Sequence, residues 1–120
     1  MNIRKIIKSF KHAFHGFKRI IREENSFQFM LLFFILLIIL MFYLPTTKIE
    51  KIILLIMALL VLSFELLNTF FERLLDFIHP NYNEVVRDLK DFLAAIVLLI
   101  SLMALVVGLI IFLPYFRDML

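Results

Sequence analysis

Residues 52–78 have the sequence IILLIMALLVLSFELLNTFFERLLDFI, in which a long apolar run continues without Gly or Pro into a polar segment. That segment carries Glu65, Asn68, Glu72 and Asp76, at intervals of three, four and four residues. At about 100° per residue, these intervals place the four side chains along one narrow stripe of a helix. Each charge at membrane depth costs roughly 2.5 to 3.5 kcal/mol, so the stripe requires either counter-ions or a function. We predict a site that binds a metal ion and phosphate.

The composition is that of a small integral membrane protein. The chain has 120 residues, of which 63% are hydrophobic, with two glycines and three prolines. Such a chain is far too apolar for a soluble domain of ordinary composition. The absence of cysteine excludes disulfides, thiolate metal sites and cysteine nucleophiles. No internal repeat or flexible linker interrupts the sequence, so we expect a single domain over residues 1–120.

Residues 3–24 form the predicted N-terminal amphipathic surface helix. Apolar residues recur at three- and four-residue steps between Ile3 and Ile21, with Lys and Arg in the gaps. This pattern is typical of a helix that lies in the membrane interface. Seven of the thirteen basic residues precede Glu23, which favours anionic lipid headgroups over nucleic acid as the partner. Packing of the apolar face on the chain's own bundle is the alternative.

Three longer apolar stretches predict transmembrane helices, at residues 27–44, 52–78 and 92–113. Between the last two, the sequence HPNYN predicts a turn with Asn83 as the N-cap of the helix that follows, and Pro114 is expected to end the third transmembrane helix. The predicted fold class is therefore an all-α membrane protein. Three thin helices bury little interior of their own, so self-association is expected.

The distribution of basic residues predicts the orientation of the chain in the membrane. The N-terminal segment holds seven Lys or Arg, whereas the first connection holds only Lys48 and Lys51. By the positive-inside rule the N-terminus is cytoplasmic. Two crossings later, residues from about 65 to 91 return to the cytoplasmic side, where nucleoside triphosphates are found.

The polar residues of this region are of the types that phosphoryl transfer requires. Mg²⁺ takes one or two carboxylates plus substrate phosphates, and Glu24 and Glu72 are best placed to supply them. Glu65 lies nearest the apolar core, where a carboxylate becomes a better proton acceptor, and is the candidate general base for a hydroxyl nucleophile. Asn68 is positioned to hold Glu65 or that hydroxyl, and Lys90 to neutralise the transferring phosphoryl group.

Conventional phosphate-binding motifs are absent from the sequence. The two glycines, Gly16 and Gly108, cannot build a Walker A loop or a kinase glycine-rich loop. A triphosphate would therefore be held by a cation, lysine and carboxylates.

The run Glu65-Leu-Leu-Asn68-Thr69-Phe-Phe-Glu72-Arg-Leu-Leu-Asp76, followed by Lys90-Asp91, resembles the signature of the prokaryotic diacylglycerol kinase family, which includes the undecaprenol kinases of Gram-positive bacteria. Residues 9–16 and 24–27 are similar to the N-terminal stretches of that family. Together these similarities extend over residues 9–114, which is nearly the whole chain.

The resemblance implies a homotrimeric bundle in the bacterial inner (plasma) membrane that transfers the γ-phosphoryl group of MgATP to a lipid alcohol such as undecaprenol or diacylglycerol. Its active sites are expected between subunits. The roles that the resemblance implies are a general base, Glu65; metal ligands, Glu24 and Glu72; a site-positioning residue, Asn68; a phosphate contact, Lys90; and nucleotide-side residues, Asp76 and Asp91.

Several positions differ from the residues usual in the family, namely Gln28, Phe70, Asn83, Leu93 and Ile96. Bulky side chains near a substrate groove leave open a catalytically silent membrane-assembly protein of the same fold. A small ion-coupled membrane protein that uses Glu65 as its ion site is another alternative. Simpler structural roles are a hydrogen bond from a neighbouring helix to Glu65 and an ion pair between Asp76 and Lys90 across the turn.

Overall fold

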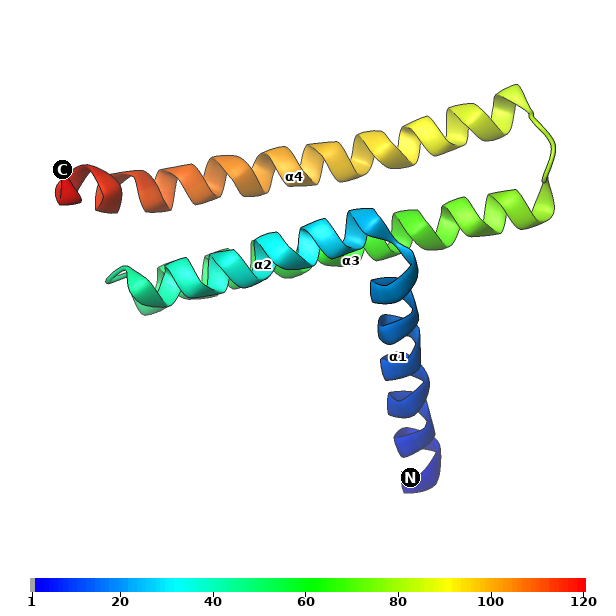
Figure 1. The fold of residues 1–120 in the computed structure, drawn as a ribbon, viewed down its shortest axis with the longest axis horizontal. Helices are drawn as coiled ribbons and strands as arrows, with labels where there is room; N and C mark the ends of the chain where they lie inside the picture. Colours follow the sequence, from blue (N-terminus) through cyan, green and yellow to red (C-terminus); the bar gives the residue numbers. More distant parts are fainter. Residues whose placement is uncertain (1) are drawn as a thin grey trace.

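The structure is a computed structural model that describes residues 2–120. In this range it has four α-helices, α1 (Ile3–Glu23), α2 (Asn25–Tyr43), α3 (Lys48–Ile78) and α4 (Glu84–Met119). Helices α2, α3 and α4 run side by side along the long axis, and α1 leaves the bundle at the start of α2 (Figure 1). Helix α3 packs against both α2 and α4, whereas α2 and α4 make no close backbone contact within residues 2–120. The predicted all-α class is confirmed.

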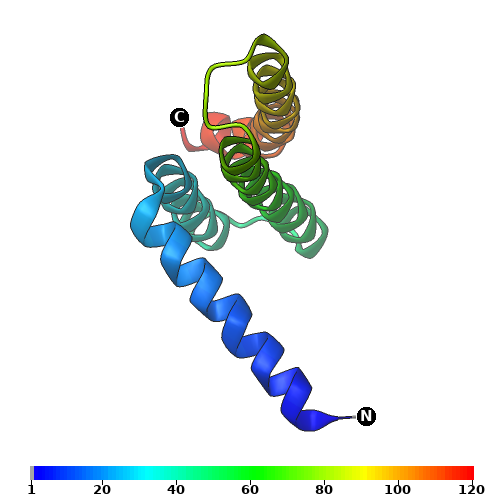
Figure 2. The same ribbon diagram turned by 90° about the vertical axis from the view of Figure 1, so that its right-hand side faces the viewer.

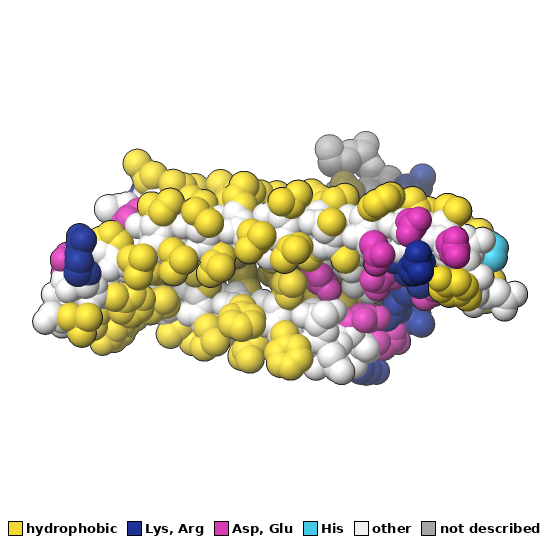
Figure 3. Space-filling view, turned by 90° about the horizontal axis from the view of Figure 1, so that it is seen from above, with side chains coloured by type: hydrophobic (Ala, Val, Ile, Leu, Met, Phe, Trp, Pro, Cys, Tyr) yellow, Lys and Arg dark blue, Asp and Glu magenta, His cyan; other side chains and the backbone are white. Residues whose placement is uncertain are grey.

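The surface of the bundle is that of a membrane protein. Helices α2, α3 and α4 are each long and apolar enough to cross a membrane. Most of their large apolar side chains are exposed, and Figure 3 shows this apolar surface over the middle of the molecule, with acidic and basic side chains gathered mainly near one end. Such a large apolar surface is stable only against lipid or other apolar protein surfaces, which confirms the predicted membrane protein.

Helix α1 is amphipathic and projects from the bundle (Figures 1 and 2). Asn2 begins it by accepting hydrogen bonds from the backbone N–H groups of Arg4 and Lys5, at 3.1 and 3.4 Å. None of its residues is buried. Packing of its apolar face on the chain's own bundle is therefore wrong for the described part of the chain. The apolar side chains that it exposes are Ile3, Ile6, Ile7, Phe10, Phe14, Phe17 and Ile21.

Helix α3 begins at Lys48 rather than at the expected residue 52. The Thr47 hydroxyl accepts a hydrogen bond from the Glu50 N–H at 3.2 Å, and the Glu50 carboxylate accepts one from the Thr47 N–H at 2.9 Å. This reciprocal capping box satisfies two N–H groups that a helix N-terminus otherwise leaves unpaired. The polar connection between the first two transmembrane helices is therefore shorter than its composition predicts.

Asn83 begins α4, as predicted. Its side-chain oxygen accepts hydrogen bonds from the N–H groups of Val85 and Val86, at 2.8 and 3.2 Å. The helix then continues from Glu84 through the charged segment into the apolar run, instead of starting afresh at residue 92. The charged residues before the third span are thus held rigidly to it.

The prediction that Pro114 ends the third transmembrane helix is wrong, because α4 continues to Met119. Proline removes one helical hydrogen bond and crowds the preceding turn at a cost of about 3 kcal/mol, so other contacts must compensate. Tyr115 supplies such contacts, since it packs on the buried cluster of α2, α3 and α4 and its hydroxyl donates a hydrogen bond to Glu50. Figure 2 shows the C-terminal turns, in red, directed aside from the rest of α4. The buried cluster consists of Met41, Leu44, Leu54, Ile111 and Phe112.

We expect Asn83→Ala to lower the free energy of unfolding by about 1 kcal/mol, because two backbone N–H groups lose their acceptor. Thermal melting in detergent measures the change. Asn81→Ala, in the same turn, is the matched control, since its side chain makes no hydrogen bond within residues 2–120. Equal melting temperatures for Asn83→Ala and the unmodified protein would contradict the cap's contribution.

Candidate active site

Glu65 is buried where the first turn of α2 meets the middle of α3. Its side chain is only 5% exposed, and its Oε1 accepts a hydrogen bond from the Ser26 hydroxyl at 2.8 Å. The two residues lie 39 positions apart in sequence. A carboxylate so buried needs a hydrogen-bond partner to remain stable, and Ser26 provides one. Glu65 therefore accepts a hydrogen bond from a neighbouring helix, which is the simpler structural role for this residue.

Asn68 lies one turn further along α3 and contacts Glu72. Its Nδ2 donates to the Glu72 carboxylate at 3.4 Å, a long hydrogen bond. Its Oδ1 is buried and has no hydrogen-bond partner within residues 2–120. Asn68 therefore does not hold Glu65 in this structure, but it presents an unused acceptor beside the predicted stripe. A buried acceptor without a partner is costly, which is an argument for a missing ligand at this place.

Arg73 connects α3 to the junction between α1 and α2. Its guanidinium lies 2.9 Å from the Glu23 carboxylate and 2.5 Å from the Glu24 carboxylate. Glu24 is the single extended residue between α1 and α2. Arg73 therefore holds the surface helix to the bundle and also occupies a carboxylate that the sequence predicts as a metal ligand.

The two predicted metal ligands have the right chemistry but do not form a complete site. Within residues 2–120, no group of three His, Asp or Glu side chains is gathered closely enough to hold a metal ion. Glu72 contacts Asn68, and Glu24 contacts Arg73. Mg²⁺ usually takes one or two protein carboxylates and completes its shell with waters and substrate phosphates. The carboxylates of Glu24 and Glu72 and the amide oxygen of Asn68 are therefore suitable types of ligand for this ion.

We expect Arg73→Gln to free α1 from the bundle. The Arg73 guanidinium, followed by Arg19, lowers the pKa of Glu23 below the ordinary value of 4.5. This ion pair is therefore fully formed above pH 4.5 and is lost as the pH falls through the lowered pKa. Spin labels on Ser9→Cys and Phe77→Cys, in a chain that has no other cysteine, report the distance from α1 to α3.

In that measurement, Arg73→Gln should broaden the distance distribution already at pH 7, whereas the unmodified protein should broaden only at acid pH. Arg22→Gln is the matched control, because it removes a basic residue next to Glu23 without removing an ion pair of the described chain. A narrow distribution for Arg73→Gln at both pH values would refute the tether.

Lys90 and Asp76 pair across the turn between α3 and α4. The Lys90 Nζ lies 2.5 Å from the Asp76 carboxylate, and both side chains are partly exposed. Asp91 is exposed next to Lys90. The ion pair between Asp76 and Lys90, which is the simpler structural role considered for these residues, is therefore formed. Through this pair Lys90 contacts α3 one helical turn beyond Glu72.

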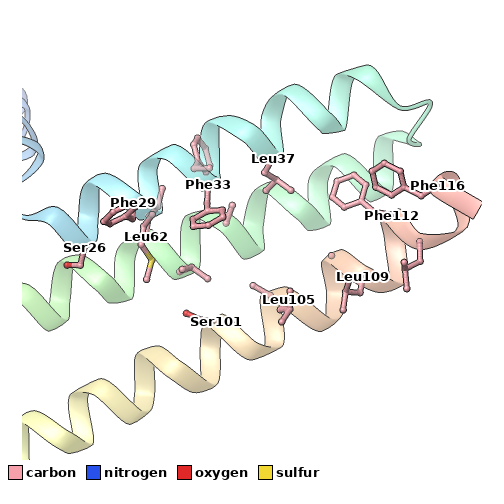
Figure 4. Close-up of a pocket in the computed structure, with 17 residues that line it drawn as sticks. Ser26, Phe29, Phe33, Leu37, Leu62, Ser101, Leu105, Leu109, Phe112 and Phe116 are labelled. Carbon is pink, nitrogen blue, oxygen red and sulfur yellow. The ribbon is translucent and has the colours of Figure 1, made fainter.

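An apolar cavity of about 720 Å³ lies between α2, α3 and α4 and extends from Ser26 toward Phe116 (Figure 4). Ser26 and Ser101 are the only polar side chains that line it, and the Ser101 hydroxyl has no hydrogen-bond partner within residues 2–120. The cavity therefore runs along the membrane-spanning part of the bundle. Glu65 does not line it, but Ser26, which does, donates a hydrogen bond to Glu65. Its apolar lining includes Phe29, Phe33, Phe34, Leu37, Leu62, Leu105, Leu109, Phe112 and Phe116.

The bulky residues expected to block a substrate groove lie elsewhere. Phe70, Leu93 and Ile96 do not line this cavity. Phe70 is 57% exposed and packs edge-on against Phe71, and Ile96 is 45% exposed. Within a single chain, nothing at these positions closes the cavity.

The structure thus holds the predicted site residues in separate local contacts: Glu65 with Ser26, Glu72 with Asn68, and Asp76 with Lys90, while Glu24 is held by Arg73 and Asp91 is exposed. Sequence reasoning missed Ser26 and Arg73 as part of this site. Each contacts a residue at least 39 positions away, and no single-helix periodicity predicts such a contact.

Comparison with known proteins finds similarity over most of the chain. The sequence profile of the family described as "Prokaryotic diacylglycerol kinase" matches residues 11–112. The chain is 31% identical over 112 residues to a protein named undecaprenol kinase from Bacillus subtilis, covering 93% of this chain and 91% of that protein. It is 32% identical over 86 residues to a protein named diacylglycerol kinase from Haemophilus influenzae, covering 72% of this chain and 73% of that protein.

This bundle spans a membrane and has a buried carboxylate next to an apolar cavity, which suits an enzyme that acts on lipids. The chain belongs to the prokaryotic diacylglycerol kinase family and is a lipid kinase.

Proposed function

We propose that this chain transfers the γ-phosphoryl group of ATP to the hydroxyl of a long-chain lipid alcohol at the cytoplasmic face of the membrane, with Glu65 as the general base. The observation that carries the proposal is the hydrogen bond between Ser26 and Glu65: the buried carboxylate already accepts a hydrogen bond from a hydroxyl, and the serine that donates it lines the apolar cavity. A lipid whose chain fills the cavity would bring its own hydroxyl to the same carboxylate.

Each bond and proton of the proposed reaction can be accounted for. The lipid oxygen attacks the γ-phosphorus, the bond from that phosphorus to the β–γ bridging oxygen breaks, and ADP leaves. The proton of the lipid hydroxyl passes to Glu65. Asn68, whose Oδ1 has no hydrogen-bond partner within residues 2–120, would help to position the reacting groups one helical turn from Glu65.

The nucleotide is proposed to lie between the carboxylate stripe and α4. Glu24 and Glu72 would hold Mg²⁺, which when bound neutralises phosphate charge. Lys90 would exchange its contact with Asp76 for the transferring phosphoryl group, and Asp76 and Asp91 would lie on the nucleotide side. The ion pair of Lys90 with Asp76, one helical turn beyond Glu72 on α3, supports this role and neutralises the lysine charge in the absence of nucleotide.

Among lipid alcohols, the cavity favours a polyprenol such as undecaprenol over diacylglycerol. Diacylglycerol carries two ester groups next to its hydroxyl, and buried carbonyl groups require hydrogen-bond donors. Among residues 2–120, the polar side chains that line the cavity are Ser26 and Ser101. Ser26 already donates to Glu65, so Ser101 alone is left for two ester carbonyl groups. A polyprenol is hydrocarbon almost up to its hydroxyl, so it needs no such donors.

Helix α1 is proposed to lie on the anionic inner leaflet of the bacterial membrane, with the N-terminus cytoplasmic. Its exposed apolar residues suit the lipid interface. A second cavity, of about 340 Å³, is lined by His15, Lys18, Arg19, Arg22 and Glu23, a mostly basic set that suits phosphate headgroups. The large apolar surface left exposed by one chain also supports assembly into a homotrimer.

The proposed function is tested by incubating the purified protein in bilayers with γ-³²P-labelled ATP and undecaprenol, diacylglycerol or ceramide. The expected result is a labelled lipid phosphate, formed fastest from undecaprenol. Absence of labelled lipid from every acceptor, in a protein with the expected helical content and melting transition, would refute the kinase assignment and favour a silent assembly protein.

A further inference from the structure

The first turn of α2 is fixed in place by contacts of the residues on either side of Ser26. Glu24 pairs with Arg73, Phe27 is 2% exposed, and the Gln28 side chain donates to the Ile21 carbonyl at 2.7 Å. Ser26 lies between these anchors, with its hydroxyl 2.8 Å from the Glu65 carboxylate. A serine held on both sides in this way has little freedom to leave Glu65.

We propose that Ser26 is a positioning residue that orients Glu65 for proton transfer, an inference that rests on the proposed function. The Ser26 hydrogen bond engages Oε1, and it is the one side-chain hydrogen bond to Glu65 within residues 2–120. A carboxylate has two oxygens with acceptor sites on each. With Oε1 held by α2, Oε2 is left to receive the proton of the lipid hydroxyl in a fixed geometry.

The location of Ser26 also couples the base to the lipid cavity. Ser26 is the only polar side chain that α2 contributes to the cavity lining, since α2 otherwise supplies Phe29, Met30, Phe33, Phe34 and Leu37. Figure 4 shows Ser26 on the same helix as Phe29, Phe33 and Leu37. The helix that forms an apolar wall for the chain therefore also supplies the hydroxyl that holds Glu65. Small errors in the placement of a reacting group cost rate rather than binding.

Ser26→Ala is therefore expected to lower kcat for lipid phosphorylation about tenfold, while KM for ATP and for the lipid changes by less than about twofold. Ser26→Thr keeps a hydroxyl at the same carbon and should restore kcat to within about threefold of the unmodified enzyme. Ser63→Ala is the matched control: Ser63 is exposed on α3 near Glu65 in sequence and makes no side-chain hydrogen bond within residues 2–120, so this variant should keep full activity.

A double variant separates positioning from a merely structural role. If Ser26 acts through Glu65, then adding Ser26→Ala to Glu65→Gln should lower the residual rate no further, because the residue to be oriented no longer works as a base. A structural role predicts that the two losses multiply. Multiplied losses, or a Ser26→Ala variant with kcat within about twofold of the unmodified enzyme, would overturn the inference. An unmodified protein that phosphorylates no lipid would instead overturn the proposed function and this inference with it.

Discussion

Glu65→Gln is expected to lower the turnover number for lipid phosphorylation on the order of 10²- to 10⁴-fold, as for the loss of a general base. The amide has nearly the same shape as the carboxylate and still accepts a hydrogen bond from Ser26, so the local packing is preserved. It cannot accept the proton of the lipid hydroxyl. The rate of labelled lipid phosphate formation at saturating ATP and lipid measures the loss.

Glu84→Gln is the matched control for this change. Glu84 is exposed in the first turn of α4 and lies outside the cavity lining, so the same substitution there should cost at most about 1 kcal/mol of helix stability through the helix dipole. Its turnover should match that of the unmodified enzyme. Lipid phosphorylation by Glu65→Gln at an undiminished rate would exclude Glu65 as the base.

Gly108→Phe should make the enzyme selective for short lipids. Gly108 lines the cavity on α4, between Leu105 and Leu109 and far from Ser26, and a Cβ at this position meets no atom within 4 Å. A phenyl ring there would occupy the part of the cavity that a long chain needs. We expect kcat/KM for undecaprenol to fall on the order of 10- to 100-fold, because the far part of its chain would no longer bind in the cavity. The kcat/KM for a short polyprenol should change little, because its chain does not extend to Gly108.

Gly16→Phe tests whether the effect is specific to the cavity. Gly16 lies on α1, and a Cβ there also meets no atom within 4 Å. This control should leave the preference between long and short polyprenols unchanged. Equal losses for long and short lipids in Gly108→Phe, together with altered oligomer size, would mean that Gly108 contacts another subunit rather than the lipid chain.

The sequence predicted the helices well but misplaced their ends. Apolar runs about as long as a bilayer core is thick leave little choice of fold, so the three spans were predictable, and the surface helix followed from its amphipathic period. The start of α3 was missed because Thr47 and Glu50 were assigned to a polar connection, although they form a capping box. The end of α4 was missed because the local effect of Pro114 was weighed without the contacts of Tyr115, which come from residues far along the chain.

The candidate site was predictable only where its residues share one helix. Helical periodicity places Glu65, Asn68 and Glu72 together because their spacing fixes their directions on α3. It gives no information on which side chain of another helix approaches them. The contacts of Ser26 with Glu65 and of Arg73 with Glu24 join segments 39 and 49 residues apart, and they depend on the packing of α2 against α3 and on where that packing places the junction between α1 and α2.

The central claim is that a lipid alcohol lies in the apolar cavity with its hydroxyl at Glu65. It is tested most directly with two photoreactive polyprenols, one with a diazirine beside the hydroxyl and one with a diazirine at the far end of the chain. The predicted result is labelling near Ser26 and Glu65 by the first probe and near Gly108 and Phe112 by the second, both displaced by undecaprenol. Labelling scattered over the outer faces of the helices, and unchanged by undecaprenol, would contradict the account.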